Sequence, residues 1–344
     1  MRQLKLALLF ACKHLGVFAA ARRLTSRHLK ILCYHGFALN DEASFRPKLF
    51  VTAATFAQRM ARLSEMGFRV LPLDEAVSSM VDGRLPRDVV AITIDDGFGS
   101  TSSVAVPVLA RHGLPSTVYV TSYYVKHNVP VYRLVVQYMI WKTAASSIAF
   151  AGRSWHADGQ VDLTTDASRE ALADELIDRG EAFETEAERL QLCEELGQLL
   201  GVPFQGIVEQ RLLHLMTPEQ LQALAGQGMD VQLHTHRHRF PSDSEAQAKR
   251  EIEDNRRSLS EWLPGKRFEH FCYPSGLWEP QQHGWLDDIG VKSSTTCLPG
   301  LNSAATPRHA LYRFLDGENI HPLEFEAAVS GFSDLLKRRG LAAS

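Results

Sequence analysis

Two adjacent carboxylates, Asp95 and Asp96, stand where a run of apolar and β-branched residues ends. The run, residues 89–94, is typical of a buried strand, and the glycine after the pair indicates a turn. Neighbouring side chains diverge at a strand end, so one carboxylate can bind a metal while the other faces a substrate. Without a partner, two like charges raise the pKa of one of them. The pair therefore predicts a bound cation.

The same order of an apolar run followed by polar residues occurs twice more. Residues 230–233 lead into His234 and His238, and residues 269–273 lead into Pro274-Ser275-Gly276. An Asp-Gly turn or a His-x-x-x-His spacing is common by itself, and the repetition is what favours a site. Two imidazoles and one carboxylate suit zinc, with cobalt, nickel or iron as substitutes.

Three protein ligands leave positions on a metal open for water. Such a metal lowers the pKa of bound water and polarises a carbonyl, while a neighbouring free carboxylate can accept the proton of the water. The residue types and their spacing therefore predict hydrolysis of an amide or an ester.

The segments around the acidic pair alternate between strand and helix patterns. The sequence predicts strands over 29–35, 68–71 and 116–121 and helices over 52–67, 73–81 and 102–112. Farther on it predicts helices over 217–228, 242–263 and 281–289 and strands over 268–273, 292–296 and 310–314. This alternation indicates a parallel α/β sheet or barrel. In a (β/α) barrel the carboxyl ends of the strands meet at one face, which brings His35 to the acidic pair and the two histidines.

The domain organisation follows from changes in pattern along the chain. Residues 1–28 form a basic amphipathic helix, and residues 29–124 form the first part of the barrel. We expect residues 125–215 to be a mostly helical insertion that covers or borders the substrate groove. Residues 216–335 would complete the barrel, and residues 336–344 would be a tail.

Composition excludes several classes of function. With a net charge of -3 and a pI near 6.5, the chain lacks the basic surface of a nucleic-acid-binding protein. Its five cysteines form no Cys-x-x-Cys pair, which argues against a disulfide framework. No segment reaches the roughly 20 apolar residues of a membrane span. We expect a cytoplasmic protein or one held at the membrane surface by its first helix, with export as an alternative.

Two of the motifs resemble those of a known family. Thr93-Ile94-Asp95-Asp96-Gly97 resembles the Thr-Phe-Asp-Asp-Gly motif of polysaccharide deacetylases with a NodB homology domain, carbohydrate esterase family 4, with Ile94 in place of phenylalanine. His234-Thr235-His236-Arg237-His238 matches the family's His-Thr/Ser-x-x-His motif. The resemblance covers about 29–124 and 215–325. It implies a distorted (β/α) barrel of the NodB-homology type with an inserted, mostly helical subdomain.

The resemblance also implies roles for individual residues. Asp95 would be the catalytic base, and the metal ligands would be Asp96, His234 and His238. Thr235 would support the second motif.

The third motif of the family, Arg-x-Pro-Tyr/Trp-Gly-like, corresponds to Cys272-Tyr273-Pro274-Ser275-Gly276, which has no arginine. Tyr273, Pro274 and Ser275 would line the substrate groove, with the Ser275 N–H as an oxyanion donor. Arg313 could replace the arginine from another strand. The histidine that acts as general acid in the family has no clean match, and His309, His321 and His35 are the candidates.

The predicted function is metal-dependent removal of N-acetyl groups from sugars of a polysaccharide or of its lipid-linked precursor. An O-acetyl esterase and a small cyclic-amide hydrolase fit the same metal site. An inactive glycan-binding module of a polysaccharide biosynthesis complex is the alternative from another class. The expected partner is the N-acetylated glycan.

Overall fold

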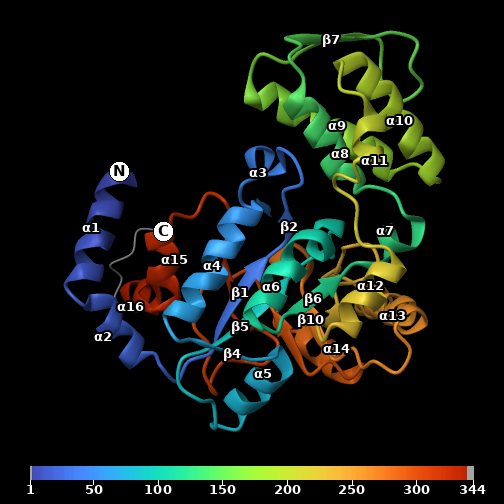
Figure 1. The fold of residues 1–344 in the computed structure, drawn as a ribbon. Coiled ribbons are helices and arrows are strands. Elements are labelled where there is room, and N and C mark those ends of the chain that lie inside the picture. Colours follow the sequence, from blue (N-terminus) through green and yellow to red (C-terminus); the bar gives the residue numbers. More distant parts are fainter. Residues whose placement is uncertain (1, 339–344) are drawn as a thin grey trace. The chain divides into compact units, whose positions relative to one another are not determined.

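Short apolar runs form the strands of a parallel sheet in the computed structural model, which describes residues 2–338 (Figure 1). The strands are β1 (Lys30–Tyr34), β4 (Arg69–Val70), β5 (Val89–Ile94), β6 (Thr117–Val120), β9 (Asp230–Leu233), β10 (His270–Cys272), β11 (Ser293–Thr295) and β12 (Phe314–Leu315). Their order is β11-β10-β9-β6-β5-β1-β12, with β4 paired to the start of β5. Strands β1 and β5 are buried along their whole length, as expected for parallel strands covered on both faces.

The segment before β12 links the two ends of this sheet. Leu311 pairs with Thr295 of β11, whereas Phe314 pairs with Leu32 of β1. The strand predicted over 310–314 is therefore divided between two neighbours, and β12 begins only at Phe314. The parallel strands curl into a distorted barrel, which confirms the predicted fold class.

Helices cover the sheet. They are α3 (Glu42–Phe45), α4 (Ala53–Glu65), α5 (Leu73–Val81), α6 (Val106–His112), α7 (Ser122–His127), α12 (Pro218–Gly226), α13 (Glu245–Trp262), α14 (Gln282–Asp288), α15 (Pro322–Val329) and α16 (Phe332–Arg338). A π-helical turn, Thr101–Ala105, precedes α6, and a small pair of strands, β2 (Gly36–Phe37) and β3 (Phe50–Val51), lies beside the barrel. Threonine side chains cap two of the predicted helices: Thr52 accepts the N–H of Thr55, and Thr217 forms a capping box with Gln220.

The first 28 residues form two helices, where the sequence predicted one. Helix α1 (Arg2–His14) and helix α2 (Val17–Leu24) meet at an angle of 74°. Gly16, between them, has a φ of 76°, a conformation that glycine adopts without steric cost and that ends α1. Among the described residues, no single helix is long and apolar enough to cross a membrane, and only the bent pair α1–α2 reaches that length and composition.

The chain divides into two units. The first holds the residues up to 126 and from 216 onward, and the second holds residues 127–215. The second unit contains α8 (Tyr132–Lys142), an antiparallel hairpin of β7 (Ser147–Phe150) and β8 (Gly159–Asp162), α9 (Asp166–Glu181), α10 (Glu186–Leu200) and α11 (Phe204–Glu209). Of the tail proposed at 336–344, residues 336–338 end α16, and the remainder lies outside the described residues.

Candidate active site

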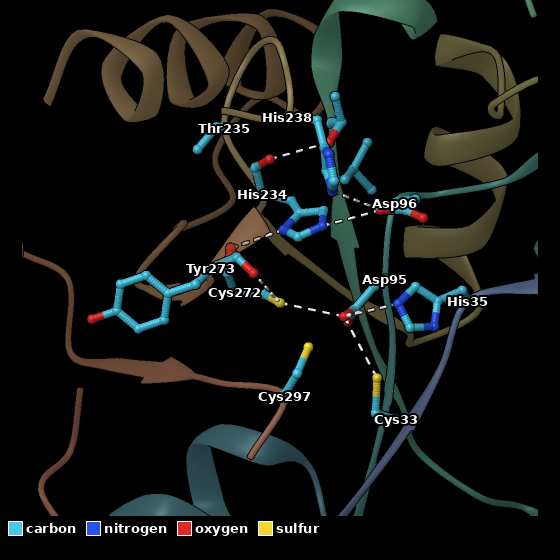
Figure 2. Close-up of polar contacts among 12 residues, drawn as sticks. Cys33, His35, Asp95, Asp96, His234, Thr235, His238, Cys272, Tyr273 and Cys297 are labelled. Carbon is cyan, nitrogen blue, oxygen red and sulfur yellow. Dashed lines mark hydrogen bonds and ion pairs between the residues drawn. The ribbon is translucent and has the colours of Figure 1, made fainter. Parts of the chain in front are cut away.

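A tight turn at the end of β5 separates the two carboxylates. Asp96 has a φ of 68° and Gly97 a φ of 85°, and the Gly97 N–H donates to the Asp95 carbonyl at 2.8 Å. Left-handed backbone is costly for a residue with a side chain, and such residues are enriched at functional sites. As a result, Asp95 and Asp96 face different sets of partners (Figure 2).

Asp96 faces the two histidines of the second motif. Its Oδ1 lies 3.1 Å from His234 Nε2 and 3.4 Å from His238 Nε2, and the three ligand atoms lie within 4.8 Å of one another. Both histidines come from the loop after β9, in which Thr235 and His238 also have positive φ values. The His238 side chain is 37% exposed, so this side of the cluster is open to solvent. Two imidazole nitrogens and one carboxylate are a donor set suited to a catalytic divalent metal.

Backbone contacts hold His234 in the orientation that a ligand needs. Its Nδ1 donates to the carbonyl of Cys272 at 2.8 Å, which leaves the Nε2 lone pair directed at Asp96. Asn255 of α13 accepts the His234 backbone N–H and donates to the Val120 carbonyl. Thr235 is buried, and its Oγ1 accepts the backbone N–H of Arg239 within the same loop.

Asp95 is held by Arg313. Nη1 of Arg313 donates to Oδ1 of Asp95 and Nη2 donates to Oδ2, each at 2.7 Å. Both side chains are buried. The Nε of Arg313 donates to the Thr296 carbonyl, and Nη1 also donates to Thr93 Oγ1. Such a forked contact fixes the carboxylate in orientation as well as in charge. Arg313 therefore supplies the arginine that is missing from the third motif, and it does so from the segment that closes the barrel.

The charge state of Asp95 follows from this contact. Burial by itself raises the pKa of Asp95, but the charge and hydrogen bonds of Arg313 outweigh it and hold the pKa well below its usual range. Burial lowers the pKa of His35, against the opposing effect of Asp95 and Asp96. At neutral pH the site therefore presents an ionised Asp95 beside a neutral His35.

Three thiols surround the Asp95–Arg313 pair. Cys33 Sγ lies 3.5 Å and Cys272 Sγ 3.3 Å from Asp95 Oδ2, and Cys297 Sγ lies 3.9 Å from Arg313 Nη2. Nothing in the spacing of residues 33, 272 and 297 along the sequence predicts that these cysteines meet. Cys272 alone could be linked to the site from sequence, because it stands at the position of the family's arginine.

The turn of the third motif has a buried part and an exposed part. The Tyr273 side chain is buried, donates to the His309 carbonyl and is directed away from the two carboxylates (Figure 2). Pro274 is buried as well, whereas Ser275 is exposed with a φ of 58°. Of the residues predicted to line a substrate groove, Tyr273, Arg313, Pro274 and Thr235 are buried, and Ser275 is exposed.

Two candidates for the general acid are placed differently. His35 Nε2 lies 3.7 Å from Asp95 Oδ2. Both ring nitrogens of His309 are engaged, Nε2 by Asp287 at 2.7 Å and Nδ1 by Ser294 at 3.0 Å. This pairing leaves His309 no ring nitrogen for a substrate, so the structure disfavours it as the proton donor.

His321, the third candidate, is engaged too. Its Nδ1 accepts the backbone N–H of Leu323, and its own N–H donates to Glu324, so that it caps the start of α15. Of the three histidines, only His35 contacts Asp95 in the described part of the chain.

Comparison with solved structures identifies proteins of the same fold. The Streptococcus pyogenes deacetylase PplD in complex with acetate superposes with a TM-score of 0.59 at 18% identity, covering 89% of this chain and 99% of that one. IcaB from Ammonifex degensii gives 0.54 at 19% identity, covering 89% and 97%. A de-N-acetylase from Aggregatibacter actinomycetemcomitans gives 0.55 at 12% identity, covering 87% and 98%.

Sequence comparison gives the family. No curated protein sequence matches the chain significantly. The sequence model of polysaccharide deacetylases matches residues 82–185 and 198–293, more than half of the chain, and these ranges include both carboxylates and both histidines of the cluster. The chain is a deacetylase hydrolase that belongs to the polysaccharide deacetylase family.

Proposed function

We propose that this enzyme is a metal-dependent N-deacetylase that removes acetyl groups from N-acetylated sugars of a polysaccharide or of its lipid-linked precursor. The observation that carries the proposal is that the two carboxylates have different partners. Asp95 is ionised and fixed by Arg313, while Asp96 faces His234 and His238. This arrangement supports a base beside a metal site.

The metal would be held by Asp96, His234 and His238. The hydrogen bond from His234 Nδ1 to the Cys272 carbonyl supports this assignment, because histidines that bind metals are commonly oriented by such a contact of the other ring nitrogen. A divalent ion held by these residues would polarise the acetyl carbonyl and lower the pKa of water. Zinc suits the donor set best, and cobalt, nickel and iron are the alternatives.

The protein residues would move the protons. Asp95 accepts a proton from the attacking water, and its low pKa means that the carboxyl gives the proton up readily. His35, 3.7 Å away, can receive that proton and deliver it to the leaving nitrogen. The backbone N–H of Ser275, a residue that is exposed, would donate to the oxyanion.

The chemistry of the leaving group distinguishes an N-deacetylase from an O-acetyl esterase or a cyclic-amide hydrolase. An O-acetyl ester or a small cyclic amide can use the same base and metal, so these remain the rival substrates. An amine leaves only after protonation, and a histidine beside the base provides for this step. The structural likeness to a protein described as a de-N-acetylase supports the same choice.

The test is an acetate-release assay with added zinc, cobalt or nickel. We expect release from N-acetylglucosamine oligomers to exceed release from O-acetyl glycans and from small cyclic amides. Asp95→Asn should bind metal as the wild type does and lose about 10²- to 10⁴-fold in rate, the usual contribution of a positioned base. Asp96→Asn, the matched control, should lose the metal itself.

Two outcomes would contradict the proposal. Faster release from O-acetyl glycans would make the enzyme an esterase. Full activity of Asp95→Asn would mean that another residue is the base.

A further inference from the structure

Helices α1 and α2 present an apolar surface to solvent. Their outer apolar face consists of six exposed side chains: Leu4, Leu8, Phe10, Leu15, Val17 and Leu24. Leu4 and Leu8 lie one turn apart on α1, and Val17 and Leu24 lie two turns apart on α2. Leu4 and Leu15 are 78% and 80% exposed. Single exposed leucines are ordinary, but six exposed apolar side chains on two successive helices indicate an interaction site.

The opposite side of the same two helices is fixed to the barrel. Leu9 and Phe18 are buried against Ala327 of α15 and Phe332 of α16. Figure 1 shows α1 and α2 beside these two C-terminal helices. The side of α1 and α2 that packs on the barrel is thus distinct from the outer apolar face, and packing on the barrel does not explain why the outer face is apolar.

Ion pairs fix the rotation of α1 about its axis. Lys5 Nζ lies 2.6 Å from Glu324 and Lys13 Nζ 2.8 Å from Glu326, both on α15. These contacts hold the cations of α1 along its flank and keep Leu4 and Leu8 directed to solvent.

The charge of the segment indicates the kind of surface that it meets. Residues 1–40 contain seven lysines and arginines and no acidic residue. Beside α2, an open cleft of about 480 Å³ is lined by Arg22, Arg23 and Arg87 together with Ala19, Ser26 and Asp88. Arg22 is engaged by Asp88, whereas Arg23 and Arg87 are exposed. Two cations at the edge of an apolar face match the phosphates at the edge of a lipid hydrocarbon layer.

We propose that the α1–α2 pair docks this deacetylase onto the surface of an anionic lipid bilayer. The outer apolar face enters the boundary between headgroups and acyl chains, and Arg23 and Arg87 contact lipid phosphates. The 13 residues of α1 span about 20 Å, less than the roughly 30 Å hydrocarbon core, and its inner side is held by the barrel, so α1 lies on the membrane. A second copy of the chain fits less well, because it would bring two strongly basic segments together.

Co-sedimentation of the full chain with vesicles tests the proposal. We expect binding to phosphatidylglycerol/phosphatidylcholine vesicles and at least about tenfold weaker binding to phosphatidylcholine alone. The triple variant Leu4→Gln/Leu8→Gln/Leu15→Gln should weaken binding to the anionic vesicles more than about tenfold. Arg23→Gln/Arg87→Gln should cost about fivefold per arginine and remove the preference for anionic lipid.

A matched control uses an exposed apolar and an exposed basic residue elsewhere. Val81→Gln/Arg84→Gln, at the end of α5, should bind vesicles as the wild type does. All variants should keep the wild-type unfolding temperature and release acetate from a soluble substrate at the wild-type rate, which separates failure of this proposal from failure of the proposed function.

Three results would overturn the proposal. The first is equal binding to neutral and anionic vesicles, or binding to neither. The second is loss of vesicle binding in millimolar inorganic phosphate at constant ionic strength, which would make the arginine cleft a site for free anions. The third is a dimer, measured by light scattering, that the triple leucine variant dissociates.

Discussion

At the scale of single residues, Asp95 depends on a partner far away in the sequence. A buried carboxylate without a counter-charge would be protonated, and a protonated Asp95 is not a base. Arg313 prevents this through two contacts of 2.7 Å. The thiols of Cys33 and Cys272 both contact Oδ2 of Asp95. Burial raises the pKa of Cys33 well above its usual range, so this thiol adds no charge beside Asp95.

Replacement of Arg313 should therefore change the pH dependence of the reaction. In Arg313→Gln, burial raises the pKa of Asp95 with no guanidinium to oppose it, so the acidic limb of the rate profile should move to higher pH. The folded-state pKa of Asp95 is depressed, so the pair stabilises the fold above the unfolded pKa of about 4, and this stabilisation is lost as the pH falls toward the folded pKa. At neutral pH we expect a cost of about 3–5 kcal/mol in the free energy of unfolding.

The measurements for Arg313→Gln are pH–rate profiles and denaturant unfolding. Arg313→Lys is the control, because it keeps the charge and loses the fork. It should retain the position of the acidic limb while lowering the rate. A wild-type profile for Arg313→Gln would show that Asp95 does not depend on this arginine.

At the scale of elements, the site consists of turns that follow strands. Asp96, Thr235, His238 and Ser275 all have positive φ values, and each lies just after β5, β9 or β10. This backbone is costly for such residues, so the strands, helix α13 and neighbouring loops must hold the turns in place. Gly276 shows how closely the turn after β10 approaches its neighbour.

The turn after β10 should be sensitive to a single methyl group. In Gly276→Ala, the new Cβ would lie 2.5 Å from Cys297 Cβ, at a residue with a φ of 69°. We expect a loss of about 2–4 kcal/mol in stability, from overpacking and left-handed strain together, and a lower rate of acetate release because Ser275 is displaced. Gly284→Ala in α14 meets no atom within 4 Å and should be neutral or slightly stabilising. The measurements are thermal unfolding and acetate release of the two variants. Equal unfolding midpoints and equal rates for Gly276→Ala and Gly284→Ala would contradict the prediction.

At the scale of the whole molecule, the barrel brings ligands from β5 and from the loop after β9 together, so metal binding should stabilise the fold. A metal at 100 times its dissociation constant adds about 2.7 kcal/mol. That corresponds to a rise of about 5–10 °C in the unfolding midpoint of the first unit. Removal by a chelator should reverse the rise, and zinc should restore it.

The control for metal stabilisation is Asp96→Asn, which removes one ligand. Its unfolding midpoint should not respond to zinc or to a chelator. A rise in this variant as large as in the wild type would place the metal elsewhere.

Local sequence determined much of this protein. The burial of β1 and β5, the caps at Thr52 and Thr217 and the turn after Asp95-Asp96 depend on residues close together in the chain, so periodicity and turn chemistry predicted them. The resemblance of two motifs added the fold class and the pairing of Asp96 with the histidines.

Tertiary structure decided the rest, because it depends on which segments meet in space. Arg313 reaches Asp95 only because residues 311–315 change partners from β11 to β1 and close the barrel. The same closure places Asp287 and Ser294 on the two ring nitrogens of His309 and leaves His35 beside Asp95. Gly16 broke the predicted first helix, and packing on α15 and α16 decided which leucines face solvent. Sequence spacing does not indicate such contacts, since Lys5 and Lys13 lie more than 300 residues from their partners Glu324 and Glu326.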